Sequence, residues 1–409
     1  RGIRMSSHRL DAQQRALMER LLRGEGVAMA APAASAVPQI EPDTARRHDP
    51  YPLTDIQQGY LLGRNRHFVL GNVSSHAYLE FEIEGLDVER YRQAWQQVIA
   101  RHDMLRTVVH DSGRQQTLAE VPPFEVAVQD LRGLEAAARE QALLALREHM
   151  SHEVRPADRW PLFDVRVSLI DGERQRIHWS FDAIVSDVYS NFIFQGELLR
   201  CYRDPQLRLP RTTLSFRDYV LALKAQEGGE AHARAQRHWQ QRLQTLAPAP
   251  ALPLARELGE LRQPHFTRLR LALAAPQWQA IRQQSRAIGV TTTVALLTAF
   301  SHVLRRWSRE PRFTLNLTLF NRQPWHPEMN DIVGDFTATL LLGVEALADG
   351  QDPSFAARAR RIQERFLDDL EHRVYSGVRV LQDWAGRSPG QGQKLMPVVF
   401  TSALQVGDV

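Results

Sequence analysis

The most restrictive feature of the sequence is a pair of strands that runs directly into a helix between residues 163 and 203. The run FDVRVSLIDGERQRIHWSFD alternates apolar and polar residues, as half-buried strands do, and its Asp171-Gly172 pair favours a tight hairpin turn. The segment SDVYSNFIFQGELLRCYRD that follows has the apolar spacing of a helix. A chain that alternates strands and helices in this way is predicted to adopt an α/β fold.

The same succession recurs on both sides of this unit. Upstream, YLEFEI at 78–83 alternates apolar and acidic residues as a half-buried strand does, and Asp87 is placed to cap a helix that buries an apolar stripe: Tyr91, Trp95, Val98 and Ile99. Downstream, the sequence predicts two helices and two strands: TTTVALLTAFSHVLRRWS, FTLNLTLFN, TATLLLGV and PSFAARARRIQERFLDDLEHR. We therefore expect two α/β lobes of similar size.

A polar, proline-containing passage, APAPALPLARELGELRQPHF, is the expected boundary between the two halves. We divide the chain into residues 1–47, an N-terminal helix and Ala/Pro-rich linker; residues 48–230, an N-terminal lobe; and residues 231–409, a C-terminal lobe. Residues 9–23 have helical periodicity, and the sequence leaves a simple tether and a docking role for this helix equally open.

Composition narrows the classes of partner. Of the 409 residues, 43% are hydrophobic, and the 51 basic and 47 acidic residues are interspersed, without the basic blocks of a nucleic-acid-binding tail. No window reaches the ~18 uninterrupted apolar residues of a membrane helix. The single cysteine, Cys201, cannot form an internal disulfide and is expected to be a buried helix residue. We expect a cytoplasmic protein with neither a nucleic-acid nor a membrane partner.

The stretch FDAIVSDVYS places two aspartates, Asp182 and Asp187, at the junction between the second strand and the helix. They could be catalytic carboxylates, metal ligands or structural groups. A metal site needs further ligands, which the neighbouring residues do not offer, whereas buried carboxylates at such a junction are expected to pair with arginine. Alternation puts His178, Ser180 and Asp182 on one face of the strand, which is the candidate site, although a strand histidine is more often simply hydrogen-bonded.

Other polar residues follow strands in the second half of the chain. They are Asn321-Arg322, Asp335 in GDFT and Thr401-Ser402. Each is weak evidence alone, because such residues at strand ends usually make local backbone hydrogen bonds. The sequence has no glycine-rich phosphate loop, no GxSxG and no HExxH motif, and this removes many common enzyme classes.

Taken together, these segments resemble, in order and spacing, the heterocyclization (Cy) domains of nonribosomal peptide synthetases, a branch of the condensation-domain superfamily. The resemblance extends from about residue 48 to the end of the chain. Six segments carry it: YPLTDIQQGYLLGR at 51–64, RHDMLR at 101–106, DAIVSDVYS at 182–190, the Thr-rich helix ending in Trp307, GDFTATLLL at 334–342 and PVVFTSAL at 397–404.

The resemblance implies a fold of two chloramphenicol-acetyltransferase-like lobes that form a V-shaped pseudo-dimer with a central tunnel. Ordinary condensation domains carry HHxxxDG at the strand–helix junction, and Asp182-Ala183 stand here in place of the two histidines. In the DxxxxDxxS motif, which ends at Ser190, the resemblance implies a structural salt bridge from Asp187 to an arginine of the other lobe. Arg322 is the candidate arginine.

The resemblance further implies two reactions at one site. A carrier-bound acyl thioester is transferred to the amine of a carrier-bound Cys, Ser or Thr, and the side chain of that amino acid then closes a thiazoline or oxazoline ring with loss of water. The second reaction needs a base and an acid. Thr401 matches the family's catalytic threonine, and Asn321 matches an asparagine implicated in cyclisation. The family's SQTPQVxLD motif is absent from the chain, which we expect to be truncated at its C-terminal end.

The same resemblance implies the partners and leaves alternatives open. Donor and acceptor carrier proteins deliver substrates on phosphopantetheine arms beside an adenylation domain, and we expect no tightly bound cofactor and no metal. We expect Asp182, Asp187, Ser190, Arg322, Asp335 and Ser402 to be structural residues at the tunnel. The alternatives to a heterocyclase are a domain that only condenses and a degenerate scaffold that docks carrier proteins.

Overall fold

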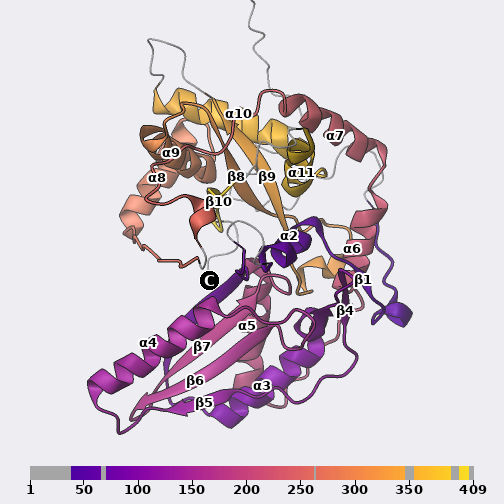
Figure 1. Cartoon of the computed structure of the whole chain (residues 1–409). Helices are drawn as coiled ribbons and strands as arrows, with labels where there is room; N and C mark the ends of the chain where they lie inside the picture. The colour runs from indigo at the N-terminus through magenta and orange to yellow at the C-terminus, as the bar shows by residue number, and fades with distance from the viewer. Residues whose placement is uncertain (1–37, 66–70, 262–263, 346–353, 388–395, 405–409) are drawn as a thin grey trace, which may run out of the picture.

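The computed structural model describes residues 38–65, 71–261, 264–345, 354–387 and 396–404. The predicted helix at 9–23 lies outside these ranges. Within them the chain forms two main sheets, one in the lower and one in the upper part of Figure 1, with helices packed against each. The predicted α/β character is therefore confirmed.

The first sheet has four strands in the order β2-β7-β6-β5. Their bounds are β2 His76–Glu84, β5 Ala127–Asp130, β6 Phe163–Asp171 and β7 Arg174–Asp182. The neighbours β2-β7 and β7-β6 are antiparallel, whereas β5 is parallel to β6. The predicted hairpin is present: β6 and β7 flank Gly172, whose φ of 45° lies in the left-handed region that glycine adopts at low cost.

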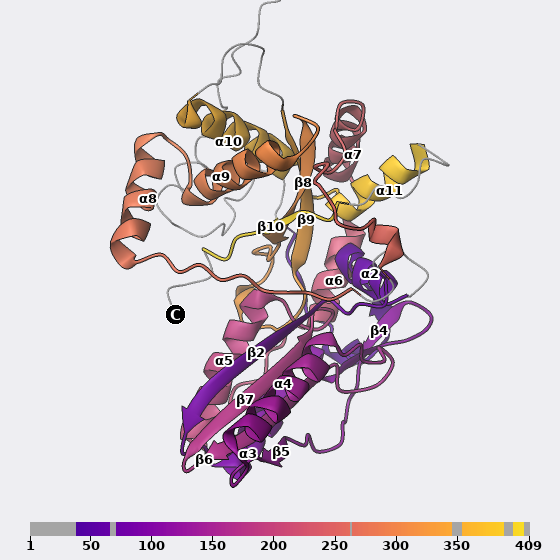
Figure 2. The same ribbon diagram turned by 60° about the vertical axis from the view of Figure 1, so that its left-hand side comes forward.

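Helices cover both faces of this sheet (Figures 1 and 2). They are α3 Val88–Arg101, α4 Ala136–His152 and α5 Val188–Arg203. The main core lies between the sheet and the pair α3 and α5, where Trp95 is fully buried among aromatic rings: Phe124, Phe163, Trp179, Phe181 and Phe194. On the other face α4 packs Leu146 and Met150 against Tyr78 of β2. Cys201 is buried in the main core, as predicted.

The polar face of β7 is not an open site, and the interpretation of this whole face as the candidate site is wrong. His178, Ser180 and Asp182 are all buried, because α4 covers their side of the sheet. Both ring nitrogens of His178 are hydrogen-bonded at 2.9 Å, Nδ1 with the Tyr78 hydroxyl and Nε2 with Ser168 Oγ. His178 is therefore a structural residue of the sheet.

Burial lowers the pKa of His178 to about 4, whereas an unfolded chain has the ordinary value near 6.5. Between about pH 6.5 and pH 4, His178 binds a proton in the unfolded state but not in the folded state. The free energy of unfolding is therefore expected to decrease as the pH is lowered to about 4. The slope is about 1.4 kcal/mol per pH unit.

In denaturant titrations over this pH range, the free energy of unfolding of His178→Gln should depend less on pH than that of the parent. His149→Gln, at an exposed position of α4, should keep the parent slope, and an equal slope in both variants would contradict the prediction.

The second sheet has the order β10-β8-β9. Its strands are β8 Phe313–Phe320, β9 Thr337–Val344 and β10 Val399–Thr401. β8 pairs antiparallel with β9 and parallel with β10. The helices around it are α7 Glu230–Arg242, α8 Ala275–Ala287, α9 Thr292–Trp307, α10 Phe355–Glu371 and α11 Gly377–Arg387. The predicted strands and helices of this half are thus all present.

Shorter elements complete the described chain. A small sheet has the order β1-β4-β3, with strands β1 Tyr51–Pro52, β3 Thr107–Val109 and β4 Arg114–Thr117. Two further helices are α2 Asp55–Gly63 and α6 Phe216–Ala225, and the 3₁₀ helices are η1 Thr44–Arg46, η2 Asp103–Arg106, η3 Leu258–Glu260 and η4 Pro327–Asn330.

Helix starts follow local chemistry. The side chain of Asp87 accepts a hydrogen bond from the Arg90 amide at 3.0 Å, so the predicted cap is confirmed. Thr291 caps α9 in the same way and accepts a hydrogen bond from the Val294 amide at 3.2 Å. Each satisfies an amide that the first turn of a helix leaves without a backbone partner. The cap of α5 is Asp187, the second aspartate of the stretch FDAIVSDVYS.

Apolar and polar contacts join the upper and lower parts. The segment after β8 enters the core of the first sheet, where Trp325 and Phe336 pack on Tyr219 of α6. At the start of α2, Asp55 accepts hydrogen bonds from Ser376 Oγ at 2.8 Å and from Arg379 Nε at 3.1 Å, both in or beside α11. The two parts are thus joined by an apolar core segment and by a polar contact between helices.

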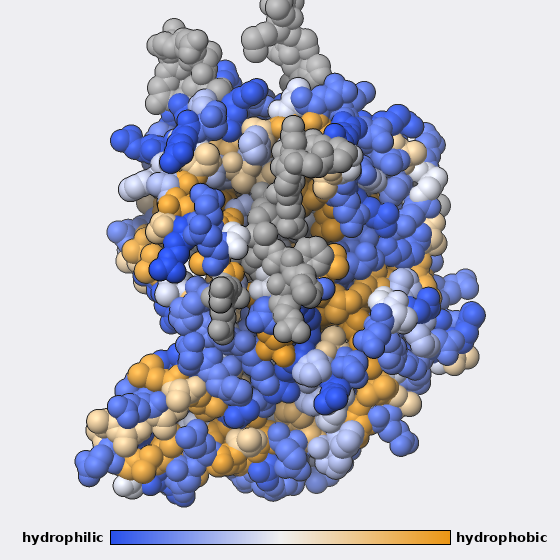
Figure 3. Space-filling view, viewed as in Figure 1, coloured by the Kyte–Doolittle hydropathy of each residue, from blue (hydrophilic) through white to orange (hydrophobic). Residues whose placement is uncertain are grey.

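Figure 3 shows that polar and charged residues cover most of one face of the molecule, with apolar residues in separate patches between them. In the described ranges, no single helix is long and apolar enough to cross a membrane; the pair α8 and α9, bent by 97°, passes such a test by length and composition only.

Candidate active site

Arg322, just after β8, is the centre of a buried polar cluster. Its Nη2 donates to Ser190 Oγ at 2.7 Å and lies 3.4 Å from Asp187 Oδ1, so the expected ion pair is present. Its Nη1 donates to the carbonyl oxygens of Met329 and Ile332, both at 2.9 Å. Burial lowers the pKa of Arg322, and the negative charge of Asp187 opposes that shift.

Two aromatic rings lie against the guanidinium group of Arg322. The guanidinium carbon of Arg322 lies 3.9 Å from the centre of the Phe336 ring and 4.6 Å from that of Tyr189. A desolvated cation on a ring face is attracted by the electron-rich π system. The side chain is consequently fixed by hydrogen bonds at its edge and by rings over its faces.

Asp187 and Ser190 bind the segment 334–336 to the start of α5. Asp187 accepts hydrogen bonds from the amides of Ser190, at 2.7 Å, and Phe336, at 3.2 Å. Ser190 Oγ donates to the Gly334 carbonyl oxygen at 2.8 Å and accepts from the Gly334 amide at 3.0 Å. Residues about 145 positions apart in the sequence thereby form one rigid junction.

Asp182 is held by a separate set of donors. Arg64 and Ser74 both donate to its Oδ2, and the Ile184 amide donates to its Oδ1 at 3.0 Å. An arginine partner was expected, but the sequence reasoning did not name Arg64. The signal for it was the final position of YPLTDIQQGYLLGR, the first segment of the resemblance. Among the described residues, neither Asp182 nor Asp187 belongs to a group with metal-ligand spacing.

Asp335 is a buried carboxyl group with one unused oxygen. Its Oδ1 accepts from the Thr337 amide at 3.1 Å, whereas its Oδ2 has no hydrogen-bond partner in the described structure. Burial raises the pKa of Asp335 well above its ordinary value, and the charge of Asp187 raises it further. Asp335 and Asn321 line a small pocket of about 60 Å³. The amide oxygen of Asn321 accepts from Gln323 Nε2.

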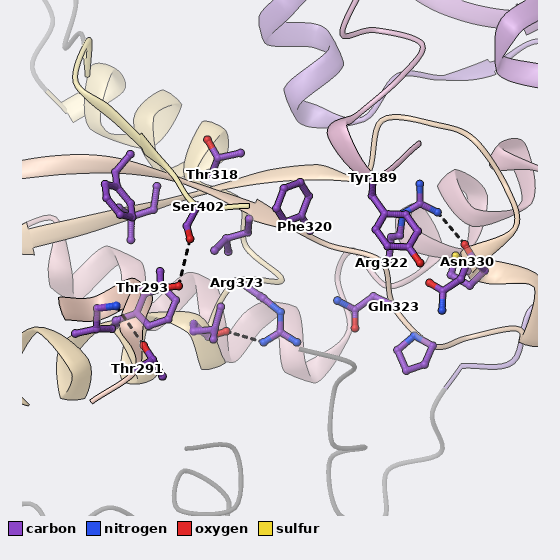
Figure 4. A pocket seen from close by; sticks show the side chains of 18 of the residues that line it. Tyr189, Thr291, Thr293, Thr318, Phe320, Arg322, Gln323, Asn330, Arg373 and Ser402 are labelled. Atoms are coloured by element: carbon purple, nitrogen blue, oxygen red, sulfur yellow. Dashed lines mark hydrogen bonds between the residues drawn. The ribbon is translucent and has the colours of Figure 1, made fainter. Parts of the chain in front are cut away.

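A much larger cavity, of about 690 Å³, is lined by residues of α9, of β8 and of the segment that follows β8 (Figure 4). Hydroxyl groups gather at one end, where Thr293 Oγ1 and Ser402 Oγ are 3.2 Å apart. The other end is lined by larger polar and aromatic side chains: Tyr189, Arg322, Gln323 and Asn330. Arg373 lies between the two ends. Arg373 lines both the cavity and the small pocket, and burial lowers its pKa.

Thr401 borders this cavity only through a neighbour. It is exposed on β10, and its hydroxyl donates to Thr318 Oγ1 at 2.9 Å. Thr318 and Ser402 line the large cavity, whereas Asn321 lines the small pocket. The structure therefore places the two predicted catalytic residues, Thr401 and Asn321, beside different spaces. The arginine that separates these spaces, Arg373, was not singled out from the sequence, because nothing local marks an arginine after a helix as a cavity residue.

A sequence model of the Condensation domain family matches residues 47–401. The chain belongs to the condensation-domain family. Among solved structures, the cyclization-docking bidomain of the nonribosomal peptide synthetase EpoB from Sorangium cellulosum matches with a TM-score of 0.83 and 40% identity, over 90% of this chain and 73% of that chain. This likeness confirms the acetyltransferase-like α/β fold that the sequence predicted.

Curated relatives place the condensation domain in the heterocyclization branch. Pyochelin synthetase PchF of Pseudomonas aeruginosa is 36% identical over 97% of this chain and 21% of its own length. Phenyloxazoline synthase MbtB of Mycobacterium tuberculosis is 36% identical over 94% of this chain and 26% of its own length. The chain thus spans about a quarter or less of these relatives, and it is a Cy-type domain of a nonribosomal peptide synthetase.

Proposed function

We propose that this Cy domain joins a carrier-bound acyl thioester to a carrier-bound Cys, Ser or Thr and then cyclises and dehydrates the product to a thiazoline or oxazoline. The observation that carries the proposal is the junction at Asp182-Ala183. Both aspartates of its motif are held by arginines, Arg64 and Arg322, and Asp182-Ala183 occupy the positions where ordinary condensation domains carry two histidines. Beside the junction lies a cavity whose far end carries hydroxyl groups. The name of the relative MbtB, phenyloxazoline synthase, and the description of the EpoB structure as a cyclization-docking bidomain support the same function.

The proposed chemistry has two balanced steps. First, the acceptor amine attacks the thioester carbonyl, a C–N bond forms, and the donor thiol leaves with the proton. Next, the acceptor's side-chain thiol or hydroxyl attacks the new amide carbonyl, and the former carbonyl oxygen departs as water when the C=N bond forms. The second step requires a group that takes the nucleophile's proton and one that protonates the departing oxygen.

Thr401 is our leading candidate for the second step, with Asn321 ranked below it. The hydroxyl of Thr401 is oriented by Thr318, which itself lines the large cavity. The side-chain amide of Asn321 is oriented by Gln323, so its NH₂ group is the part left to polarise a carbonyl. The remaining motif residues, Asp182, Asp187 and Ser190, are proposed to position the junction rather than to react.

The proposed partners follow from the same function. Donor and acceptor carrier proteins would deliver both substrates on phosphopantetheine arms, beside an adenylation domain that selects the amino acid. The 690 Å³ cavity has room for a substrate of drug-like size. The residues that line it supply hydrogen bonds and apolar contacts, and we propose no tightly bound cofactor for the reaction.

The test weighs the product formed from a donor acyl carrier and a cysteinyl carrier. Condensation adds the acyl group, and cyclisation also removes one water. We expect Thr401→Ala to lower the rate of water loss by about tenfold or more, the equivalent of one hydrogen bond in the transition state, with condensation largely retained. Thr401→Ser keeps a hydroxyl at the same place and serves as the control.

Each outcome of this test separates the candidate functions. Full dehydration by Thr401→Ala would remove Thr401 from the catalytic assignment. A parent domain that condenses without losing water is a condensation-only domain, and one that binds carriers but forms no product is a docking scaffold.

A further inference from the structure

Two histidines from different helices face each other outside the cavity. His238 of α7 and His372, which ends α10, have ring centroids 3.8 Å apart and an interplanar angle of 5°. Asp368 lies one turn before His372 on the same face of α10. Each of the three side chains offers one ligand atom, and these atoms lie within 4.8 Å of one another. The packing of α7 on α10 thus gathers two imidazoles and a carboxylate at one place.

The surroundings fix one nitrogen of each ring. His238 Nε2 lies 3.1 Å from Asp369 Oδ1, and His372 Nδ1 lies 2.9 Å from the backbone oxygen of Asp368. Carboxylate and carbonyl oxygens accept hydrogen bonds, so each of these nitrogens carries a hydrogen and the other nitrogen of each ring presents a lone pair. Histidines that bind metals usually donate their second nitrogen in this way, which fixes the tautomer and makes the ligand more basic.

The carboxylate behind His238 is itself held firmly. Asp369 is fully buried, and Arg242 Nε donates to its Oδ1 at 3.2 Å. Arg242 and His238 both contact Asp369, so the imidazole of His238 has a negatively charged neighbour that is held in place. A carboxylate–histidine pair of this kind is a common outer support of zinc sites.

We propose that His238, His372 and Asp368 bind one divalent transition-metal ion, with Zn²⁺ as the best match. Two imidazoles and one carboxylate suit zinc, which takes three protein ligands and a water in sites of this composition. The rings are parallel, so both lone pairs reach one ion only after a ring turns about χ2, a torsion that is soft in histidine. We propose that the His372 ring turns and gives up its bond to the Asp368 backbone oxygen, whereas His238 keeps its bond to Asp369. Arg365 Nη1 lies 3.5 Å from one oxygen of Asp368 and is the only competing cation that the described contacts give for this carboxylate.

A second group with ligand spacing provides a comparison within the same chain. It consists of Glu148, His152 and His265. Its Glu148 and His265 side chains are 61% and 59% exposed, whereas the His238 side chain is 16% exposed and rests on a buried carboxylate. Of the two groups, the one formed by His238, Asp368 and His372 is therefore the one in which a buried carboxylate orients a ligand histidine. Its proposed effect is to tie α7 to α10, a helix that lines the large cavity with Phe366 and Leu370.

The test titrates Co²⁺ and then Zn²⁺ into the untagged protein after removal of metal with a chelator. We expect one equivalent of Co²⁺ to give the visible absorption bands of a low-coordinate site, Zn²⁺ to displace it, and the melting temperature to rise with either ion. His238→Ala and His372→Ala should lose the spectrum. The Asp368 side chain is 43% exposed, and Asp368→Asn should weaken binding by about tenfold or more.

His152→Ala is the matched control and should bind as the parent does. Circular dichroism of each apo variant shows whether a loss of binding reflects a lost fold. The proposal is overturned if the folded parent does not bind one equivalent of Co²⁺ or Zn²⁺. It is also overturned if His152→Ala loses binding while His238→Ala retains it. These readouts are independent of activity, so the result does not depend on the proposed function.

Discussion

Replacement of Arg322 by alanine is expected to destabilise the domain by about 3–5 kcal/mol, because it leaves the buried carboxylate of Asp187 without its cation. The same change removes the donors to the carbonyl oxygens of Met329 and Ile332 and to Ser190 Oγ. Three segments lose their common partner at once: η4, the segment before β9 and the start of α5. The free energy of unfolding, measured by denaturant titration, is the quantity to compare.

Arg132→Ala is the matched control for this variant. Arg132 also contacts an aspartate, Asp130, at 2.7 Å, but both side chains are about half exposed. Exposed pairs contribute about 0–1 kcal/mol, because water screens the charges and hydrates each partner when the other is removed. Equal effects of the two variants would show that burial of the Arg322 cluster does not matter. Asp187→Asn is expected to lower the melting temperature; lost activity at an unchanged melting temperature would make Asp187 a catalytic group instead.

Gly334→Ala is expected to destabilise the domain by about 3 kcal/mol, at the upper end of overpacking effects. A Cβ atom at this position would lie 2.7 Å from Cε2 and 2.8 Å from Cγ of Phe216, whose ring is buried against Phe336. The backbone cannot retreat, because the amide and carbonyl of Gly334 are both hydrogen-bonded to Ser190 Oγ. Either the ring or these two bonds must give way.

Gly196→Ala tests the same chemical change where space is open. Gly196 lies inside α5, and an added Cβ would meet no atom within 4 Å. Alanine restricts the unfolded chain and favours the helix, so this variant is expected to gain about 0.5–1 kcal/mol. A stabilised Gly334→Ala, or two variants with equal unfolding free energies, would contradict the steric explanation.

The elements of this domain could be predicted because their signals are local. The hairpin of β6 and β7 follows from a period of two and an Asp171-Gly172 turn, and the cap at Asp87 acts on an amide three residues away. Interactions that span only a few residues can be recognised from neighbouring positions in the sequence. The Asp187–Arg322 contact was also found before the structure, but only through resemblance to a family, since nothing local links residues 135 positions apart.

The site was predicted less completely, because side chains meet there from distant segments. Alternation separated the two faces of β7 correctly, yet it could not show that α4 covers the polar face and buries His178. Nor could motif order show that Asn321 lines one space while Thr318, the partner of Thr401, lines another. The outcome in each case depends on which helix or strand packs against a given face.

The amino-acid sequence was sufficient to predict the α/β elements, the helix cap at Asp87 and the family to which the chain belongs. Tertiary structure alone decided that Arg64 holds Asp182 across 118 positions, and that His238 meets His372 between α7 and α10. The physical reason is the range of the interactions. Periodicity and capping act within a few residues, whereas the partner of a buried charge or an imidazole is selected by the packing of whole elements, which brings together residues that no local pattern relates.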